Sequence, residues 1–260
     1  LAVSFRESGG PSHGWNVKVF LKGIVLSATY RQSSVASPKL RELDPDNHLL
    51  ARGPSYRLAA EQIRDNALKA SGLLVGKIGG PSVFPYQPGG VWEALSTLKY
   101  PQGHGDSLYR RSLYTFWKRT APHPALVTFD VPEKHFCTVR RQNTSTPLQA
   151  LVTLNDPQFV EAARVLAERV LREGGATPDG RVQWAFRAVL NRPARAAEVR
   201  LVRALVETEA REFGQAPARV RGLLTVGERP PDARLKPAEV AAWTVAALLL
   251  FNHDEAVVKR

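Results

Sequence analysis

The sequence predicts a mainly α-helical protein, an irregular helical bundle with a long ordered loop region rich in glycine, proline and aromatic residues. Three observations lead to this prediction. In several segments apolar residues recur at intervals of three and four, which places them on one side of a helix. Capping residues or prolines open some of these segments, and glycines follow others. The sequence has no alternating strand pattern and no repeat of fixed length, which argues against a sheet or a solenoid.

The first 75 residues predict two helices and a connector. Val17–Ala28 carries an apolar stripe and follows Asn16, a residue type that favours the N-cap position. Ala60–Leu74 carries a second stripe and runs into a cluster of glycines, which end helices readily. Between them, Pro38–Leu50 is interrupted by Asp-Pro-Asp-Asn, so we expect a short turn of helix followed by a connector.

The region after residue 145 predicts a compact set of helices. Thr146-Pro147 and Asp156-Pro157 each combine a capping side chain with a proline suited to the first helical turn. Two capped starts ten residues apart predict a tight corner between a short helix and a longer one. Three further apolar stripes predict helices over 182–190, 202–213 and 237–251.

The segment between these two regions is dense in glycine and proline. Gly76–Asp106 also contains Phe84, Tyr86, Trp92 and Tyr100, which is unlike a flexible linker, so we expect an ordered loop. The aromatic and basic residues that follow, 108–117, are compatible with a strand or a helix. We expect a single helical domain over 1–260, with seams between a two-helix front (1–75), the loop-rich segment (76–145) and a helical bundle (146–260).

The net charge of +12 and the pI of about 10.2 raise the question of a polyanionic partner. The basic residues are spread along the chain and often stand at helical spacing from acids, as in Glu161 with Arg164 and Glu168 with Arg172. We interpret these pairs as a well-solvated helical surface. Polyanion binding is therefore the weakest hypothesis, and nucleic acid is not an expected partner.

Other features of the composition limit the classes of protein to which the chain can belong. The longest apolar stretch, Val240–Phe251, is about half the length needed to span a bilayer, so no membrane span is expected. Cys137 is the only cysteine, which excludes an internal disulfide and an all-cysteine zinc site. The chain contains no methionine and starts at Leu1, so we expect a fragment or processed product of a larger multidomain protein.

The common catalytic motifs are absent or incomplete. Gly72–Lys77 has the wrong spacing for a phosphate-binding loop, and Gly53–Ser55 and Gly80–Ser82 lack the second glycine of a nucleophile elbow. Cys137 follows His135 by two residues, but we interpret a lone cysteine as a small buried apolar residue. Consecutive helical positions point His253–Glu255 in different directions, so no metal site is expected. The catalytic residues are unknown, and whether the chain is an enzyme stays open.

The candidate ligand-binding residues lie in the loop-rich segment and at the helix starts after it. Arg140 and Arg141 could bind an anionic group or brace the chain against carboxylates and carbonyls, and the aromatic rings could bind a ligand or pack in the core. Bracing and packing are our preferred interpretations. The candidates are Tyr86, Trp92, Arg110, Arg111, Arg140, Arg141, Asn155 and Asp156.

Five segments together resemble one known family. They are LSATYRQSS, GGPSVFPYQPGGVWE, LYRRSLYTFWKRTAP, VRRQNTSTPLQALVTLNDPQFVEAAR and FNHDEAVVKR, which are spread over nearly the whole chain. They resemble the planctomycete-type secreted C-terminal domain of unknown function, which is found in proteins with N-terminal cytochrome-c-like domains. Phe251 and His253 depart from that pattern, which usually has leucine and other apolar residues there.

The resemblance implies a modular parent protein exported to the periplasm or cell envelope. It implies an upstream c-type haem domain and an uncharacterised domain between that domain and this chain, so the expected partners are the upstream domains of the same polypeptide. We expect no cofactor in this chain itself. The family has no established catalytic residues to transfer.

Three hypotheses follow. The leading one is a structural or ligand-binding C-terminal module of an exported multidomain protein. The alternative is a polysaccharide-acting enzyme or carbohydrate-binding module, with aromatic platforms and carboxylates that could perform acid–base work. The weakest is polyanion binding. The carboxylates considered for the second hypothesis are Asp106, Asp130, Glu133, Asp156 and Glu255.

Overall fold

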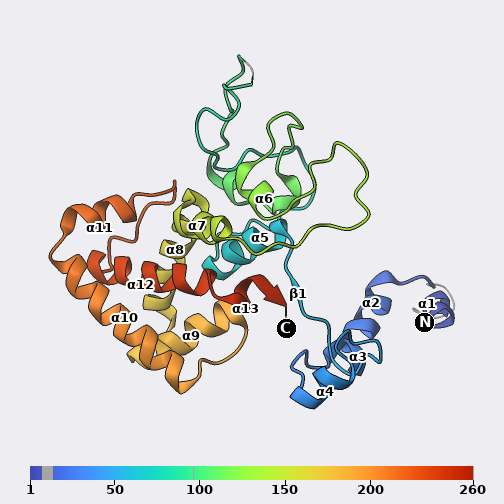
Figure 1. Cartoon of the computed structure of the whole chain (residues 1–260). Coiled ribbons are helices and arrows are strands. Elements are labelled where there is room, and N and C mark those ends of the chain that lie inside the picture. Colours follow the sequence, from blue (N-terminus) through green and yellow to red (C-terminus); the bar gives the residue numbers. More distant parts are fainter. Residues whose placement is uncertain (8–13, 96, 260) are drawn as a thin grey trace. The chain divides into compact units, whose positions relative to one another are not determined.

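The computed structural model describes residues 1–7, 14–95 and 97–259 (Figure 1). The chain divides into two compact units, Leu1–Tyr56 with Val258–Arg260, and Arg57–Val257. The fold is mainly α-helical, as predicted, and the strands of the described part are the two-residue β1 (Tyr56–Arg57) and β2 (Val258–Lys259), which pair with each other. The boundary after Tyr56 does not coincide with the seam expected at residue 75. The helix over residues 60–71, which was expected in the front part, packs within the larger unit.

The smaller unit contains four short helices, α1 (Ala2–Glu7), α2 (Val17–Leu26), α3 (Ala28–Arg31) and α4 (Pro38–Leu43). The predicted cap is present, since Asn16 Oδ1 accepts a hydrogen bond from the backbone N–H of Val19 at 3.1 Å. The helix ends two residues earlier than expected. Ser27 adopts an extended conformation there and caps α3 through the N–H of Tyr30. None of the residues in these four helices is buried.

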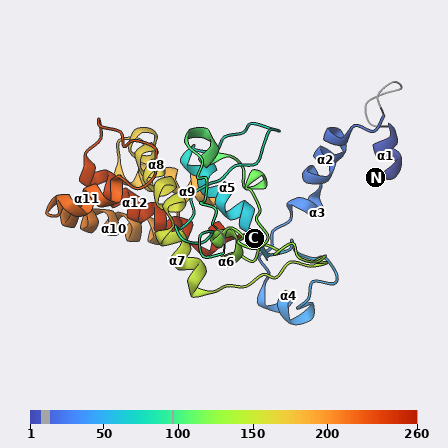
Figure 2. The ribbon, with the colours of Figure 1, turned by 90° about the horizontal axis from the view of Figure 1, so that it is seen from above.

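The larger unit has its core around helix α12. This helix is apolar on all sides and buries most of its residues, packing mainly on α8 and α10, which lie beside it in both views (Figures 1 and 2). The larger helices of the unit are α5 (Ala60–Ser71), α7 (Pro147–Asn155), α8 (Pro157–Glu173), α9 (Pro178–Leu190), α10 (Ala196–Gly214), α11 (Pro217–Leu224) and α12 (Pro237–Phe251), and the short α13 (Asp254–Val257) follows.

The predicted corner between α7 and α8 is confirmed. Thr146 Oγ1 accepts from the N–H of Gln149, and Asp156 Oδ1 accepts from the N–H of Gln158 at 2.9 Å, so each helix start has a side-chain cap. Helix α11 was not predicted. That helix is short and has no side-chain cap, so its local signal is weak.

The loop-rich segment is ordered, as predicted, although its helices are short: η1 (Gly105–Tyr109), η2 (Ser112–Tyr114) and α6 (Pro124–Thr128). Backbone hydrogen bonds join Val83 to Tyr114 and Phe116, and an aromatic cluster of Phe84, Trp92, Tyr100 and Phe116 has ring centroids 4.8–6.1 Å apart. Residues 108–117, for which the sequence was compatible with a strand or a helix, therefore contain short 3-10 helices.

No helix in the described ranges has the length and apolar character required to cross a bilayer.

Candidate functional site

The most unusual polar group of the larger unit is the guanidinium of Arg64, on α5. Its side chain is only 5% exposed and it has no directly hydrogen-bonded carboxylate among the described residues. Nη1 donates to Arg110 O and Ser112 Oγ, and Nη2 donates to Leu108 O at 2.6 Å and Gln158 Oε1 at 2.7 Å. Burial lowers the pKa of Arg64 to about 10, so it stays charged at neutral pH. This one side chain therefore joins α5, the 3-10 turns and α8.

His123 lies beside this centre and is also buried. Its Nε2 donates to Tyr86 O at 2.8 Å, which leaves Nδ1 of the neutral ring as an acceptor, and Nδ1 has no partner among the described residues. Burial lowers the pKa of His123 to about 4, with the Arg64 charge as a further cause in the same direction. The imidazole is therefore neutral at physiological pH.

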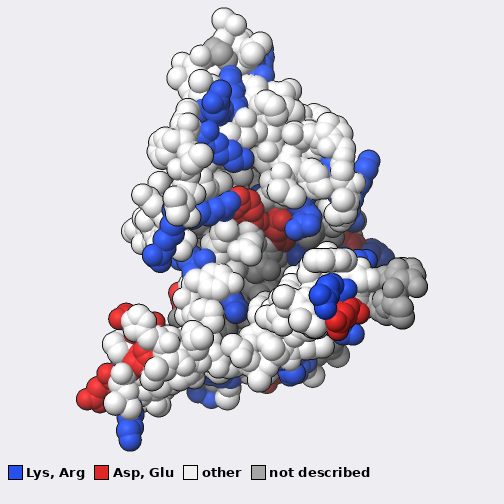
Figure 3. All heavy atoms as spheres, turned by 90° about the vertical axis from the view of Figure 1, so that its right-hand side faces the viewer, with Lys and Arg blue, Asp and Glu red and all other residues white. Residues whose placement is uncertain are grey.

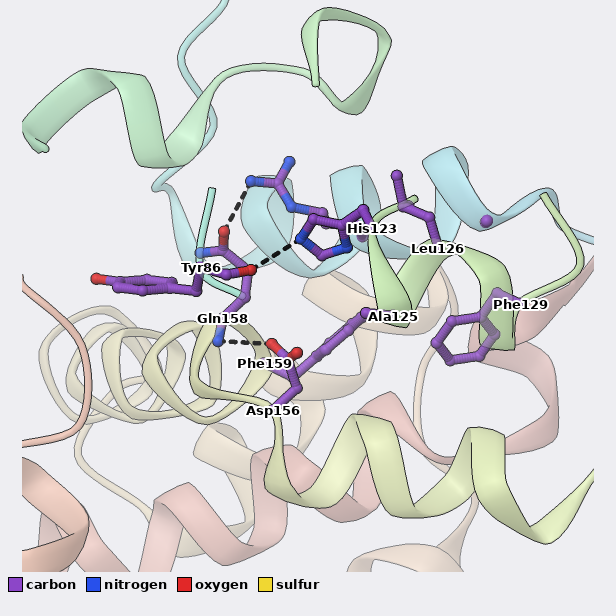
Figure 4. Close-up of a pocket in the computed structure, with 10 residues that line it drawn as sticks. Tyr86, His123, Ala125, Leu126, Phe129, Asp156, Gln158 and Phe159 are labelled. Atoms are coloured by element: carbon purple, nitrogen blue, oxygen red, sulfur yellow. Dashed lines mark hydrogen bonds between the residues drawn. The ribbon is translucent and has the colours of Figure 1, made fainter. Parts of the chain in front are cut away.

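A small cavity adjoins His123 (Figure 4). The ring of His123, the apolar side chains of Leu126 and Phe159 and the carboxylate of Asp156 are among its walls. Its volume is about 10 Å³, close to that of a single water and far below the several hundred Å³ of an ordinary ligand pocket. Burial also raises the pKa of Asp156. Several groups with shifted pKa values, Arg64, His123 and Asp156, line this cavity. Their shifts result from burial in a packed core, and the cavity is too small to admit a substrate.

A second buried cluster corrects a prediction. Glu161 and Arg164 were expected on a solvated surface, yet both side chains are fully buried on α8. Glu161 Oε1 accepts from Tyr109 Oη at 2.8 Å and from the N–H groups of Glu228 at 2.8 Å and Arg229 at 2.7 Å. Three donors thus replace the water that a surface carboxylate would have had.

The same face of α8 holds the loop between α11 and α12. Arg164 pairs with Glu168 at 2.7 Å and donates through Nη2 to Arg229 O. Gly227, at φ 87°, lies so close that an added Cβ would be 2.2 Å from Glu161 Cδ. The charged side chains of α8 therefore position a loop, and the sequence spacing alone did not indicate this function.

Tyr86 and Trp92, the two aromatic candidates, are both packed in the interior. Tyr86 accepts from the N–H of Glu228 through its hydroxyl, and burial together with the nearby Glu161 charge raises its pKa to about 12. Trp92 is 7% exposed within the aromatic cluster, and the Lys118 ammonium lies 4.2 Å from the centre of its ring. Their placement agrees with the packing interpretation.

Arg110 and Arg111 are adjacent in sequence but have different environments. Arg110 is buried, donates to the carbonyls of Lys77 at 3.0 Å and Gly79 at 2.6 Å, and lies over the Tyr114 ring. It braces the glycine–proline loop. Arg111 is half exposed, and its Nε is 3.8 Å from Asp65.

The remaining candidates lie apart from this buried centre. Arg141 forms a two-point ion pair with Glu61 at 2.7 and 3.1 Å, whereas Arg140 is exposed and has no hydrogen-bond or ion-pair partner within the described residues. Asn155 donates to the Leu151 carbonyl of its own helix. Of the eight candidates, Tyr86 and Asp156 line the same small cavity, so the structure does not bring the set together as one site.

The residues that sequence reasoning missed are Arg64, Tyr109, His123, Gln158 and Glu161. One signal was available, because Arg64 stands four residues after Ala60 and three before Ala67, on the apolar face of α5. A charged residue at such a position must bring its own partners into the core. No comparable local pattern marked His123.

A groove along α5 in the larger unit has a volume of about 740 Å³. Asn66 and Lys69 have exposed side chains there with no intramolecular hydrogen-bond partner among the described residues. Asp65 contributes a carboxylate that also accepts from Ser112 N and Oγ at 2.7 Å. The other lining residues are Leu58, Glu61, Gln62, Leu74, Gly76, Arg111 and Leu113.

On the face shown in Figure 3, Lys and Arg side chains follow one side of the upper part, and others stand beside Asp or Glu. Within the residues that the structure describes, no three His, Cys, Asp or Glu side chains are grouped so that they could hold a metal ion.

The smaller unit has a different character, because its large apolar side chains face solvent. On α2, Val17 is 56% exposed, Leu21 52% and Leu26 56%. The buried residues in the described part of 1–56 are Asp44 and Gly53. The predicted apolar stripe of α2 is thus present; Phe20 packs on Phe5 of α1 with ring centroids 4.6 Å apart, whereas Val17, Leu21 and Val25 stay exposed.

Comparison with known proteins gives one match. The model of the family PSD1, a protein of unknown function (DUF1553), matches residues 1–206, which include the smaller unit and much of the larger one. No curated protein and no solved structure matches the chain.

Proposed function

The chain belongs to the PSD1 family of proteins of unknown function (DUF1553), and from this premise we propose that it is a structural docking module of a longer protein. In this proposal the larger unit is a rigid helical scaffold, and the smaller unit attaches to a neighbouring domain of the same polypeptide. The attachment is made by the apolar surface of α2. The chain itself performs no reaction.

The exposed apolar surface of α2 carries this proposal. Water disfavours exposed apolar area, and a helix of this length gains most of its stability from packing. The sequence of α2, VKVFLKGIVL, has two charged residues, Lys18 and Lys22, one helical turn apart. The rest of the surface is suited to a hydrophobic groove, as in other helix-in-groove contacts.

The buried centre supports a scaffold role. Arg64 and Glu161, both on well-packed helices, use their hydrogen bonds to fix neighbouring loops. The cavity beside His123 has room for about one water, so the lowered pKa of His123 arises where no substrate can enter. We further propose, from the family resemblance, that the parent is exported and carries an upstream c-type haem domain.

The test is binding between this chain and the neighbouring domain of its parent, purified separately. Wild-type chain is expected to bind, and a Leu21→Ser/Val25→Ser variant is expected to lose the interaction, with affinity measured by isothermal titration calorimetry. Leu201→Ser is the matched control, because Leu201 is 70% exposed on α10. Failure of the wild type to bind, or equal binding by the α2 variant, would refute the proposal.

A second candidate function is ligand binding in the α5 groove, which is large enough for an oligosaccharide or short peptide and has unpaired polar groups at Asn66 and Lys69. Tyr86 and Trp92 are buried, so a glycan would contact the α5 groove and not an aromatic platform. The melting temperature should be measured with neutral and sulfated polysaccharides at low and high salt. A salt-resistant rise that is lost in Asn66→Ala/Lys69→Ala supports this candidate, and no rise with any glycan rejects it.

A further inference from the structure

Residues 131–143 form a loop whose two ends are tied together. The carboxylate of Asp130 accepts from the N–H of Thr144 at 2.7 Å and from Thr144 Oγ1 at 2.8 Å. Gln149, on α7, donates to the same hydroxyl at 3.1 Å. The segment is therefore an Ω-type loop, in which the chain leaves and returns at nearly one point.

The base of this loop is fixed to the larger unit on two sides. On one side, Trp117 Nε1 donates to the carbonyl of Glu133, and the Lys134 ammonium lies 4.6 Å from the centre of the Trp117 ring. On the other side, Arg141 is paired with Glu61 of α5. The middle of the loop is thus presented outward from an anchored base.

The tip carries apolar side chains that face water. Phe136 is 75% exposed and Val139 fully exposed, and Cys137 between them is exposed as well, contrary to the expectation that it is buried. Apolar side chains in such a position would be stabilised by any apolar medium that covers them. Both protrude from an extended loop, which differs from the flat apolar patch of a typical protein interface.

The charges around the tip are mainly positive. Residues 131–143 include Lys134, Arg140 and Arg141 against the single acid Glu133, although Arg141 is paired with Glu61 and Lys134 lies over Trp117. Arg140, next to Val139, has no partner within the described residues. Lysine and arginine near an anionic lipid surface each strengthen binding, while apolar side chains enter the boundary between headgroups and acyl chains.

We propose that the 131–143 loop is a membrane-surface contact, in which Phe136 and Val139 insert into a bilayer containing anionic lipid and Arg140 binds its headgroups. Lipid is favoured over an acidic protein partner because single protruding side chains need no complementary pocket in a bilayer. The proposal is independent of the docking role of α2, which lies in the smaller unit.

The sole cysteine provides the direct test. The full chain, labelled at Cys137 with an environment-sensitive fluorophore, is mixed with vesicles of phosphatidylglycerol and phosphatidylcholine or of phosphatidylcholine alone. We expect a blue-shifted, brighter emission and co-sedimentation with the anionic vesicles, both weakened at high salt. Absence of binding would overturn the proposal. Binding in which the Cys137 label stays in water would also overturn it, because another surface would then carry the contact.

Three variants separate the contributions. Phe136→Ser/Val139→Ser should weaken vesicle binding by about tenfold or more, and Arg140→Gln should weaken it only for anionic vesicles. Leu201→Ser, which removes an equally exposed leucine on α10, should bind as the wild type does. Far-ultraviolet circular dichroism confirms that each variant is folded. Unchanged binding by the loop variant, or loss of binding by Leu201→Ser, would contradict the assignment.

Discussion

At Gly227 the chain turns with a left-handed backbone, and the buried carboxylate of Glu161 occupies the space that a side chain would need. Gly227→Ala should therefore lower the free energy of unfolding by about 2 kcal/mol or more, from both the positive φ and the steric conflict. Urea unfolding measures the change. Gly222→Ala is the control, because that exposed glycine lies inside α11 with open space around its Cα, and alanine there should raise stability by up to about 1 kcal/mol. If Gly227→Ala and Gly222→Ala changed the free energy of unfolding by the same amount, Glu161 would not occupy this space.

His123 predicts an acid-sensitive fold. Its pKa is about 4 in the folded protein and near 6.5 when unfolded, so between these values the unfolded state binds the proton more tightly. Stability should fall as pH decreases from about 6.5 to 4, by about 3 kcal/mol from this residue. His123→Gln keeps a donor for Tyr86 O and removes the titration. Urea unfolding at several pH values should give a shallower decline for this variant, and an identical decline would exclude His123 as a source.

The site residues show how far individual positions could be predicted. Bracing was predicted for Arg140 and Arg141, of which Arg141 pairs with the Glu61 carboxylate. The bracing of the glycine–proline loop by Arg110 was not predicted. The burial of Glu161 was not predictable, because Tyr109 and Gly227 lie 52 and 66 residues away in sequence. A residue's neighbours along the chain do not reveal such donors.

Among the structural elements, the glycine–proline loop depends on Arg110 for its shape. Arg110→Met should lose the bonds to the Lys77 and Gly79 carbonyls and lower the free energy of unfolding by about 2 kcal/mol. Amide hydrogen exchange across residues 76–83 should accelerate. Arg111→Met is the comparison, because the exposed Arg111 has a weak contact with Asp65 and its loss should cost less than about 0.5 kcal/mol. A similar cost for both variants would contradict the bracing role.

Helix starts were predictable where a capping side chain marks them, whereas α9 and α10 begin four and six residues before the predicted ranges. Asn16, Thr146 and Asp156 each accept the expected backbone hydrogen bond, because a cap is an interaction between residues two or three positions apart. Helix α11 was missed because it has only eight residues, too few for a clear apolar stripe, and begins at Pro217 without a capping side chain. The predicted end of α2 was wrong because Ser27, within the apolar stripe, is the N-cap of the next helix, α3.

For the whole molecule, the division into two units predicts unequal sensitivity to mutation. Leu166 is fully buried on α8, and Leu166→Ala should lower the free energy of unfolding by about 3 kcal/mol. Leu21→Ala, on exposed α2, should change it by less than about 0.5 kcal/mol. Urea unfolding followed by tryptophan fluorescence measures both. A large loss for Leu21→Ala in the isolated chain would mean that α2 is already covered, which would contradict the docking proposal.

By itself the sequence determined the mainly α-helical class, the starts of most long helices and the order of the loop-rich segment. These features arise from propensity, capping and periodicity, which act over a few residues. Tertiary structure decided which faces are buried, so the apolar stripe of α2 is exposed whereas the charged Arg64 and Glu161 lie inside. Burial depends on partners that are distant in sequence, and a pattern of residues along one helix cannot specify which of them will cover it.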